Sequence, residues 1–338
     1  MVMGRRDLLR VGALAATAVA ASACTRALPE TSPDRAPVTA RPRTPRRSTA
    51  ARSGRAAIAP PAGHVYYGAS VPHYRSLEEW EQQLGNPLAV NRSFFSPVRH
   101  QPRDLVRCCL DDIAAGRLPH VSIKPLGTWR DVASGSRDVW LEAMLRPLRE
   151  AGAPVLFTMH HEPENDAGAP GMQPADFIAM QRHLIDLAEG DGSPVVVVPV
   201  LQQWTFDPVR DDIDPADWVV PEATVAGLDV YNHWSPTNGK PWRSFGSKLD
   251  EAITWLGDVP VVIGEYGCRE DAQNPGLAAE WLRDAAEYAR EHDVIAMSYY
   301  NSRINAPEGT WELSPTSEQV FAELLGSEWV ARPSGVGS

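Results

Sequence analysis

Residues 195–204 read Val-Val-Val-Val-Pro-Val-Leu-Gln-Gln-Trp, an apolar run that ends in polar and aromatic side chains. Because successive residues of a strand point to opposite faces, a strand made of this run would be apolar on both faces. Such strands are typical of parallel sheets that helices cover. The run therefore predicts one strand of a buried parallel sheet, with polar side chains at its carboxyl end.

Seven further runs of this kind occur along the chain. The eight predicted strands are Val65–Val71, Ala89–Phe95, His120–Pro125, Pro154–Glu162, Val195–Trp204, Val225–Trp234, Val259–Gly267 and Ile295–Asn301. Most connections between them carry apolar residues three or four apart, which predicts core-facing helices. The predicted helices are Leu77–Leu84, Asp104–Ala115, Val139–Glu150, Pro174–Ala188, Lys248–Leu256, Leu277–His292 and Ser317–Leu325. The fifth connection, Thr205–Thr224, contains only a short candidate helix, around Pro215–Val219.

Eight strand–helix units within residues 63–330 predict an α/β fold, the (β/α)8 TIM barrel, whose usual size is about 250 residues. The rival is an open doubly wound sheet, which carries a glycine-rich phosphate-binding turn after its first strand. Here Val71-Pro72-His73 follows the first strand, so the barrel is favoured. Residues 331–338 are expected to form a flexible tail.

The chain before residue 63 has a different composition. Residues 1–62 hold eleven Arg and three acids, a net charge of +8, whereas residues 63–338 carry a net charge of −19. Arg5-Arg6 precede thirteen apolar, mostly Ala residues, which are too few to cross about 30 Å of hydrocarbon. Residues 1–24 therefore resemble a twin-arginine signal peptide. Ala21-Ser22-Ala23-Cys24 resembles a lipobox, which implies Cys24 as a lipid anchor, and cleavage without lipidation is the alternative.

Residues 25–62 are rich in Pro, Arg and Ser and show no apolar period, so we expect a disordered linker. The predicted location is the cell surface, with the membrane contacted through the lipid on Cys24, or the extracellular space. The acidic body would repel phosphate backbones, which argues against nucleic acid as a partner. We expect a monomer.

Functional residues of (β/α)8 barrels lie at the carboxyl ends of the strands. Glu162 closes the apolar run of the fourth strand, and Glu265 follows the apolar run of the seventh. A carboxylate at such a place is partly desolvated, which is typical of functional residues. Two carboxylates that converge across the barrel mouth, about 5 Å apart, are what retaining glycoside hydrolysis requires.

Three motifs, in this order, resemble glycoside hydrolase family 26. They are His-His-Glu-Pro-Glu-Asn at 160–165, Gly-Leu-Asp-Val-Tyr-Asn at 227–232 and Val-Ile-Gly-Glu-Tyr-Gly at 262–267. This family belongs to the clan of retaining barrel glycosidases with the acid/base on strand 4 and the nucleophile on strand 7. The resemblance implies Glu162 as acid/base and Glu265 as nucleophile, with no cofactor. It also implies that His161 orients the sugar or the acid and that Tyr231 donates a hydrogen bond to Glu265.

The predicted activity is retaining hydrolysis of a β-linked polysaccharide by an exported β-glycosidase, mannanase-like or β-glucanase-like. Aromatic and amide side chains near the strand ends are the predicted sugar contacts, because aromatic rings offer apolar faces to sugar C–H groups. They are Trp129, Trp204, Trp234, Asn232 and Tyr300. Tyr299-Tyr300 stands where members of the clan commonly place Trp. Four other tryptophans lie in helical stripes and are predicted to be core: Trp80, Trp140, Trp255 and Trp281.

Other interpretations of the same residues stay open. The chain could be a catalytically silent surface lipoprotein that binds glycan, although a pure binder has no need of two carboxylates in one mouth. His160, His161 and Glu162 could suggest a metal, but adjacent strand residues point to opposite faces and no HExxH spacing occurs. Glu164, beyond the strand end, is a weaker candidate acid. We therefore predict no metal.

Overall fold

The computed structural model describes residues 58–190, 192–306 and 308–333. The expected signal peptide, its Cys24 and the linker up to residue 57 lie outside the described residues, as do residues 334–338 of the expected tail. The described strands are β1 (Tyr66–Ser70), β2 (Val90–Phe95), β3 (Leu118–Ile123), β4 (Val155–Met159), β5 (Val195–Val197), β6 (Val200–Gln202), β7 (Ala226–Asn232), β8 (Val261–Cys268) and β9 (Ala296–Tyr300).

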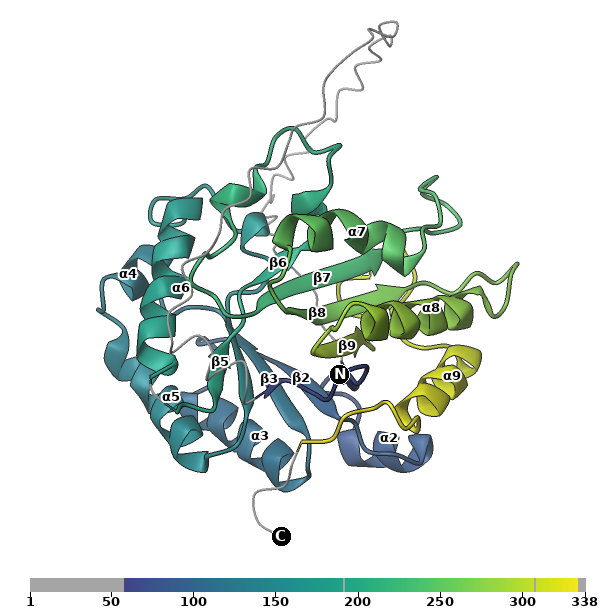
Figure 1. The fold of residues 1–338 in the computed structure, drawn as a ribbon, viewed down its shortest axis with the longest axis horizontal. Helices are drawn as coiled ribbons and strands as arrows, with labels where there is room; N and C mark the ends of the chain where they lie inside the picture. The colour runs from purple at the N-terminus through teal and green to yellow at the C-terminus, as the bar shows by residue number, and fades with distance from the viewer. Residues whose placement is uncertain (1–57, 191, 307, 334–338) are drawn as a thin grey trace, which may run out of the picture. The chain divides into compact units, whose positions relative to one another are not determined.

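The strands form one parallel sheet in the order β5-β4-β3-β2-β1-β9-β8-β7-β6 (Figure 1). Its two ends, β5 and β6, are consecutive halves of one predicted strand, separated by Val198 and Pro199. Val198 N donates to Phe157 O on the β4 side, and Gly227 N of β7 donates to Pro199 O. The interrupted strand thus pairs with one neighbour before the proline and with the other after it. Counted as one strand, it makes eight positions and closes the predicted barrel.

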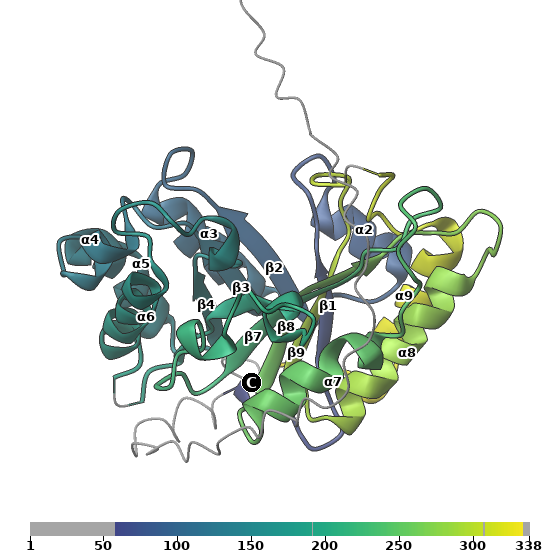
Figure 2. The same cartoon turned by 90° about the horizontal axis from the view of Figure 1, so that it is seen from above.

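Helices cover the outside of this barrel (Figures 1 and 2). They are α2 (Leu77–Leu84), α3 (Pro102–Ala114), α4 (Trp129–Ala133), α5 (Asp138–Ala151), α6 (Pro174–Ala188), α7 (Phe245–Leu256), α8 (Leu277–Glu291) and α9 (Pro315–Leu325). Each predicted helix is present. The connection between β6 and β7 holds short 3-10 turns instead, η2 (Gln203–Phe206) and η3 (Pro215–Asp217), in agreement with its weak apolar pattern, and η1 (Pro163–Asn165) follows β4.

The first and last helices of the barrel, α2 and α9, pack against each other, because the first and last strand–helix units are neighbours in the closed barrel. Trp80 of α2 stacks on Phe321 of α9 with ring centroids 5.6 Å apart. The Trp80 indole N–H also donates to Glu318 Oε2 over 2.8 Å. A buried indole that keeps a hydrogen-bond partner avoids the cost of an unpaired donor. The contact ties the two ends of the barrel sequence together.

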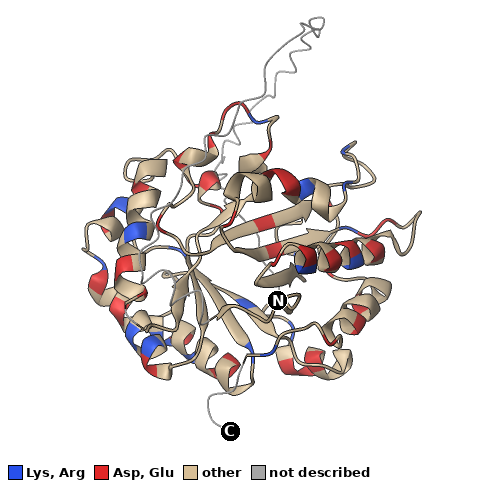
Figure 3. Cartoon of the chain, in the orientation of Figure 1, with Lys and Arg blue, Asp and Glu red and all other residues tan. Residues whose placement is uncertain are grey.

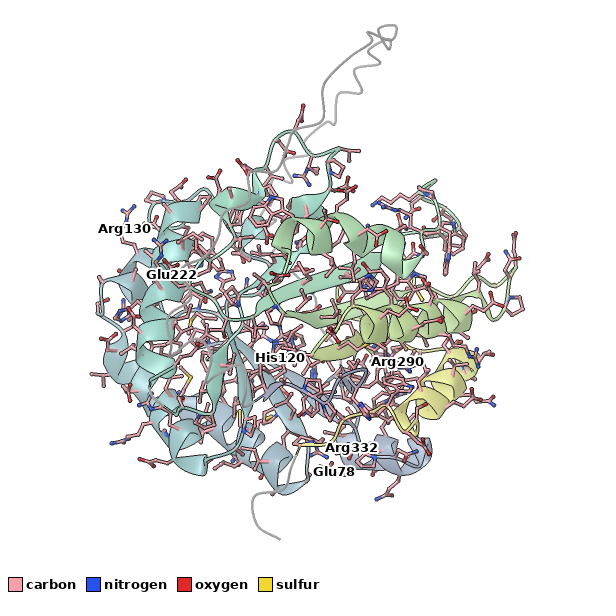
Figure 4. All side chains as sticks on the ribbon, in the orientation of Figure 1. Glu78, His120, Arg130, Glu222, Arg290 and Arg332 are labelled. Atoms are coloured by element: carbon pink, nitrogen blue, oxygen red, sulfur yellow. The ribbon has the colours of Figure 1, made fainter. Side chains whose placement is uncertain are left out.

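The interior of the barrel is packed. His120 of β3 lies near its centre, is fully buried, and has its Nε2 atom 3.1 Å from Thr158 Oγ1 (Figure 4). Burial lowers the pKa of His120 well below its usual value, so the ring is neutral at physiological pH. A neutral, hydrogen-bonded histidine fills this space without burying a charge.

Two features differ from the sequence interpretation. Ile58 is fully buried in the hydrophobic core, so packed chain extends five residues before the predicted boundary at residue 63. Trp255 is 40% exposed, so its prediction as core is wrong, whereas Trp80 and Trp281 are buried as predicted. Trp140 is half-buried against the core. Among the described residues, no helix has the length and apolar character needed to cross a membrane.

Candidate active site

Glu162 lies just beyond the end of β4, in a backbone conformation that non-glycine residues rarely adopt. Its φ is 49°, and that of His160 is 61°, both in the left-handed region. Glu162 N donates to Val200 O of β6, which holds this turn against the neighbouring strand. Left-handed residues cost free energy and are found mostly where a side chain must be aimed. The turn after β4 therefore directs the Glu162 carboxyl group, which accepts a hydrogen bond from Asn165 Nδ2 over 3.1 Å.

Glu265 lies within β8 and is nearly enclosed, with 6% of its surface exposed. The hydroxyl of Tyr231, on the adjacent strand β7, donates to Glu265 Oε2 over 2.6 Å. The β7–β8 register shifts between Leu228 and Asp229, which places Asp229 opposite Glu265. Tyr231 thus occupies the position that the family resemblance implied for it.

His161 approaches Glu265 from the other side. Its Nε2 atom lies 3.9 Å from Glu265 Oε1, which is too far for a hydrogen bond. Its Nδ1 atom lies 2.8 Å from Ser122 Oγ of β3, which fixes the orientation of the ring. Burial and the positive charge of Arg92 lower the pKa of His161 well below its usual value. The structure therefore places a neutral imidazole beside the buried carboxylate.

Arg92 of β2 is the buried cation of this site. It is 1% exposed, and its guanidinium makes no hydrogen bond or ion pair with the described residues. Its charge acts on three carboxyl groups, those of Asp229, Glu265 and Glu162. From the sequence, Arg92 and Lys124 could each pair with an acid or bind an anionic sugar, and a structural ion pair is the favoured interpretation. Lys124 has one, 2.6 Å from Asp166 Oδ2, whereas Arg92 faces the candidate catalytic residues.

The surroundings of the two glutamates favour different protonation states. Burial, followed by the negative charges of Glu265 and Glu164, raises the pKa of Glu162 to about 8. Burial also raises the pKa of Glu265, but Arg92 and the Tyr231 hydrogen bond oppose that rise. Glu265 therefore ionises first, and Glu162 keeps its proton at neutral pH. One acid and one carboxylate in a single site is the arrangement that acid-assisted nucleophilic displacement requires.

A third carboxyl group, Asp229, is buried beside them at 3% exposure, and neither of its oxygens accepts a hydrogen bond from the described residues. Burial and the charges of Glu265 and Glu162 raise its pKa well above the usual value, which favours the protonated form of Asp229. Gly264 makes room for it, because a Cβ atom there would lie 2.6 Å from Asp229 Oδ1.

Glu164 serves the structure of the loop. It accepts hydrogen bonds from Thr205 Oγ1 over 2.5 Å and from Gln202 N over 3.0 Å. These bonds join the turn after β4 to the end of β6. Its carboxyl group thus faces Thr205 and Gln202, in agreement with its ranking below Glu162 as a candidate acid.

The residues His160, His161 and Glu162 do not converge. His160 accepts from the Trp129 indole N–H over 2.7 Å and lies 2.7 Å from Asp166 Oδ2, while His161 contacts Ser122 and Glu162 contacts Asn165. Within the described part of the chain, no group of three or more His, Cys, Asp or Glu side chains is arranged to hold a metal ion.

Two of the predicted sugar contacts are buried. Trp129 is fully buried, and its ring packs against Phe177 and Trp218 at centroid distances of 5.4 and 6.3 Å, so its prediction as a sugar contact is wrong. Asn232 is 1% exposed, and its amide donates to Arg243 O over 3.1 Å. Because Asn232 also lines a cavity between β7 and α7, its role as a sugar contact stays a prediction.

Three other predicted contacts remain accessible. Trp204 and Trp234 are half-buried, and the guanidinium of Arg210 lies 4.1 Å from the Trp204 ring. The ring of Tyr300, at the end of β9, lies edge-on to Tyr231 at 6.1 Å. Tyr300 thus stands next to the Tyr231–Glu265 pair.

Two residues of the site, Phe94 and Ser122, were missed from the sequence. Phe94 lies between His161 and Tyr300. The signal for both residues was their position near the carboxyl ends of β2 and β3. Trp311, a loop tryptophan that the sequence offers either as a sugar contact or as packing, is 4% exposed and packs on Tyr231 with ring centroids 4.7 Å apart.

Solved structures of glycoside hydrolases share this fold. The catalytic domain of the Bacillus sp. JAMB-750 GH26 endo-beta-1,4-mannanase aligns over 85% of this chain and 92% of its own, with a TM-score of 0.55 and 14% identity. GH26A from Muricauda sp. MAR_2010_75 aligns over 84% and 96%, with a TM-score of 0.54 and 14% identity. PbGH5A, a glycoside hydrolase family 5 enzyme from Prevotella bryantii B14, aligns over 84% and 100%, with a TM-score of 0.54 and 14% identity.

No family model and no curated protein sequence matches the chain. At 14% identity, the likeness to solved structures confirms the predicted (β/α)8 barrel as a fold. The chemistry of the site has to be argued from its own residues.

Proposed function

We propose that this protein is a retaining β-glycosidase that hydrolyses a β-linked polysaccharide. The observation that carries the proposal is the unequal environment of the two glutamates. Tyr231 and Arg92 favour the anion of Glu265, whereas the pKa of Glu162 is raised to about 8. The two groups lie on β4 and β8, the fourth and seventh positions of the barrel. The likeness in fold to family 26 and family 5 glycoside hydrolases supports this reading.

The proposed reaction is a double displacement. The Glu265 carboxylate attacks the anomeric carbon while the protonated Glu162 gives its proton to the leaving glycosidic oxygen. This step forms a glycosyl ester on Glu265 and releases the first product. Glu162, now ionised, takes a proton from water as the water attacks the anomeric carbon, which breaks the ester and restores both glutamates.

The proposed substrate is a mannan or a β-glucan. Trp204, Trp234 and Tyr300 supply aromatic faces around the mouth, which suit the C–H faces of pyranose rings. The test is release of reducing ends from a panel of β-mannans and β-glucans, with a Glu265→Ala variant as the inactive control. Release by the wild type alone supports the proposal. Binding to a glycan with no release by either protein would instead favour a silent glycan-binding barrel.

We also propose that the protein is exported by the twin-arginine route and anchored through lipid on Cys24. Support comes from Arg5-Arg6, the short apolar stretch after them, and the residues that precede Cys24. Arg5→Lys combined with Arg6→Lys should retain the precursor in the cytoplasm. Cys24→Ala should move the mature protein from the membrane fraction to the soluble fraction. Unchanged fractionation of either variant would reject the corresponding half of the proposal.

A further inference from the structure

A cavity of about 230 Å³ lies in the connection between β7 and α7, close to the candidate active site. Three cationic side chains line it, those of Lys240, Arg243 and Lys248. The rings of His233 and Trp234 form another part of its wall. Figure 3 shows basic residues in this connection. Three cations around one small cavity are unusual in a body of net charge −19, residues 63–338.

The positive charge of the cavity is weakly compensated. Arg243 Nη1 lies 3.6 Å from Asp207 Oδ2, whereas Lys240 and Lys248 form no ion pair within 4.0 Å among the described residues. The more distant charges of Asp207 and Glu308 act on Lys248 and Lys240, respectively. Lys248 is half-buried, and burial together with the charges of Arg243 and Lys240 lowers its pKa, while Asp207 opposes that shift. Burial and the charges of Lys248 and Lys240 likewise lower the pKa of His233 to about 4. The cations therefore repel one another, and an anion between them would relieve that repulsion.

The ring of His233 lies between the cavity and the candidate catalytic residues. The centroid of His233 lies 5.9 Å from that of Tyr231, whose hydroxyl donates to Glu265. Trp234, on the cavity wall, is held edge-on by Trp242 at 5.3 Å. A sugar chain that reaches from Glu265 past His233 would thus meet an aromatic ring and three cations.

We propose that this cavity is a subsite for a sugar unit that carries an anionic group, a ring carboxylate or a sulfate ester, on the polysaccharide. The inference rests on the proposed function for its sugar chain. Lys240 and Lys248 supply ammonium groups for either oxyanion, and Arg243 adds positive charge while its guanidinium is held by Ser247 O and Asp207. Because the body carries a net negative charge, these three cations form a local site of attraction, which would select where the charged unit lies.

The test compares matched oligosaccharides on the full chain carrying Glu265→Gln, which prevents turnover. The probes are β-1,4-oligomannuronate and β-1,4-mannooligosaccharide of equal length, the matching glucuronate and glucose pair, and a sulfated mannooligosaccharide. We expect an acidic oligomer to bind at least about tenfold more tightly than its neutral partner at low salt, and the difference to shrink as ionic strength rises. Preference among the acidic probes distinguishes carboxylate from sulfate.

Two substitutions in the cavity test whether its lysines cause the preference for acidic oligomers. Lys248→Met and Lys240→Gln should each reduce the acidic-to-neutral affinity ratio about threefold or more, as expected for loss of one charge contact. The matched control is Arg283→Gln on α8, which removes an exposed positive charge that pairs with Glu323, away from the cavity. Melting curves check that each variant is folded, and exposed Lys240 keeps the test usable if Lys248 variants unfold.

The outcomes separate this inference from the proposed function. Charge-dependent binding that Lys240 and Lys248 control supports the subsite even if the wild type hydrolyses nothing. Equal affinity for acidic and neutral oligomers overturns the subsite, even where the wild type hydrolyses a neutral polysaccharide. A ratio that Arg283→Gln lowers as much as Lys248→Met would also overturn it, because the effect would then be one of overall charge.

Discussion

The Tyr231 hydroxyl lies 2.6 Å from Glu265 Oε2, between adjacent strands of the barrel. Burial, followed by the charge of Glu265, raises the pKa of Tyr231 well above its usual value, so the phenol stays protonated and donates. A donor aimed at a carboxylate stabilises its charged form. Together with buried Arg92, this contact keeps Glu265 the more acidic of the two glutamates.

Removal of that donor should lower activity, because the Glu265 anion loses a bond that stabilises and orients it. Tyr231→Phe takes away a charge-assisted hydrogen bond worth about 1.5–3 kcal/mol, so kcat/KM should fall about tenfold to a hundredfold. Because the lost bond favoured the anion, the pKa of Glu265 should rise, and the acidic limb of the pH profile should move to higher pH. Tyr288→Phe, on the outer helix α8, is the control and should leave the profile in place. An acidic limb that Tyr231→Phe leaves unmoved would contradict the assigned contact.

The basic limb of the profile should belong to Glu162. Activity requires its proton, so the rate should fall as pH rises through the pKa of about 8 at which Glu162 ionises. Glu162→Ala should remove this limb and slow hydrolysis of natural glycans by about 10²–10⁴-fold, since general acid catalysis contributes that much. An activated aryl glycoside needs little protonation, so its first step should survive. A basic limb that persists in Glu162→Ala would assign the acid to another residue.

Two tryptophans should differ in their effect on stability. Trp129 is fully buried and hydrogen-bonded to His160, so Trp129→Ala should lower the free energy of unfolding by about 3–5 kcal/mol. Trp255 is 40% exposed, so Trp255→Ala should cost about 1 kcal/mol or less. Chemical denaturation of both variants measures the difference. Similar losses would mean that Trp255 is packed as the helical pattern alone suggested.

The boundary of the folded body can be tested at Ile58. Since Ile58 is fully buried, Ile58→Ala in the full chain should cost about 2–5 kcal/mol. A chain shortened to begin at residue 63 should melt at a lower temperature than one that begins at residue 57. Equal melting temperatures for these two chains would favour a linker that extends to residue 62.

The sequence predicts the barrel well because its strands are continuous apolar runs and because apolar residues recur every three to four positions in its helices. The interruption at Pro199 is visible as a residue without an N–H, but which neighbour each half of the strand pairs with depends on tertiary structure. Glu162 and Glu265 could be predicted because each comes soon after an apolar run, although Glu265 lies within β8 and Glu162 lies just beyond β4.

Other parts of the site depend on information that the sequence does not carry locally. An aromatic ring in a loop can face the mouth or the core, which is why the sequence cannot tell that Trp129 is packed inside the protein. From the sequence, Arg92 is expected to form an ordinary ion pair. Its burial and its lack of a hydrogen-bond partner among the described residues are evident only in the structure. The left-handed backbone at His160 and Glu162 could not be predicted, because neither residue is a glycine, the residue that usually marks this conformation in a sequence.

The most direct test of the account is the reaction of Glu265→Ala on an activated β-aryl glycoside with added azide. Hydrolysis should be abolished, because the attacking carboxylate is gone. Azide should enter the vacated space and yield a glycosyl azide of inverted configuration, whereas Glu162→Ala should yield one of retained configuration. An azide product of retained configuration from Glu265→Ala, or wild-type activity in that variant, would contradict the assignment of Glu265 as the nucleophile.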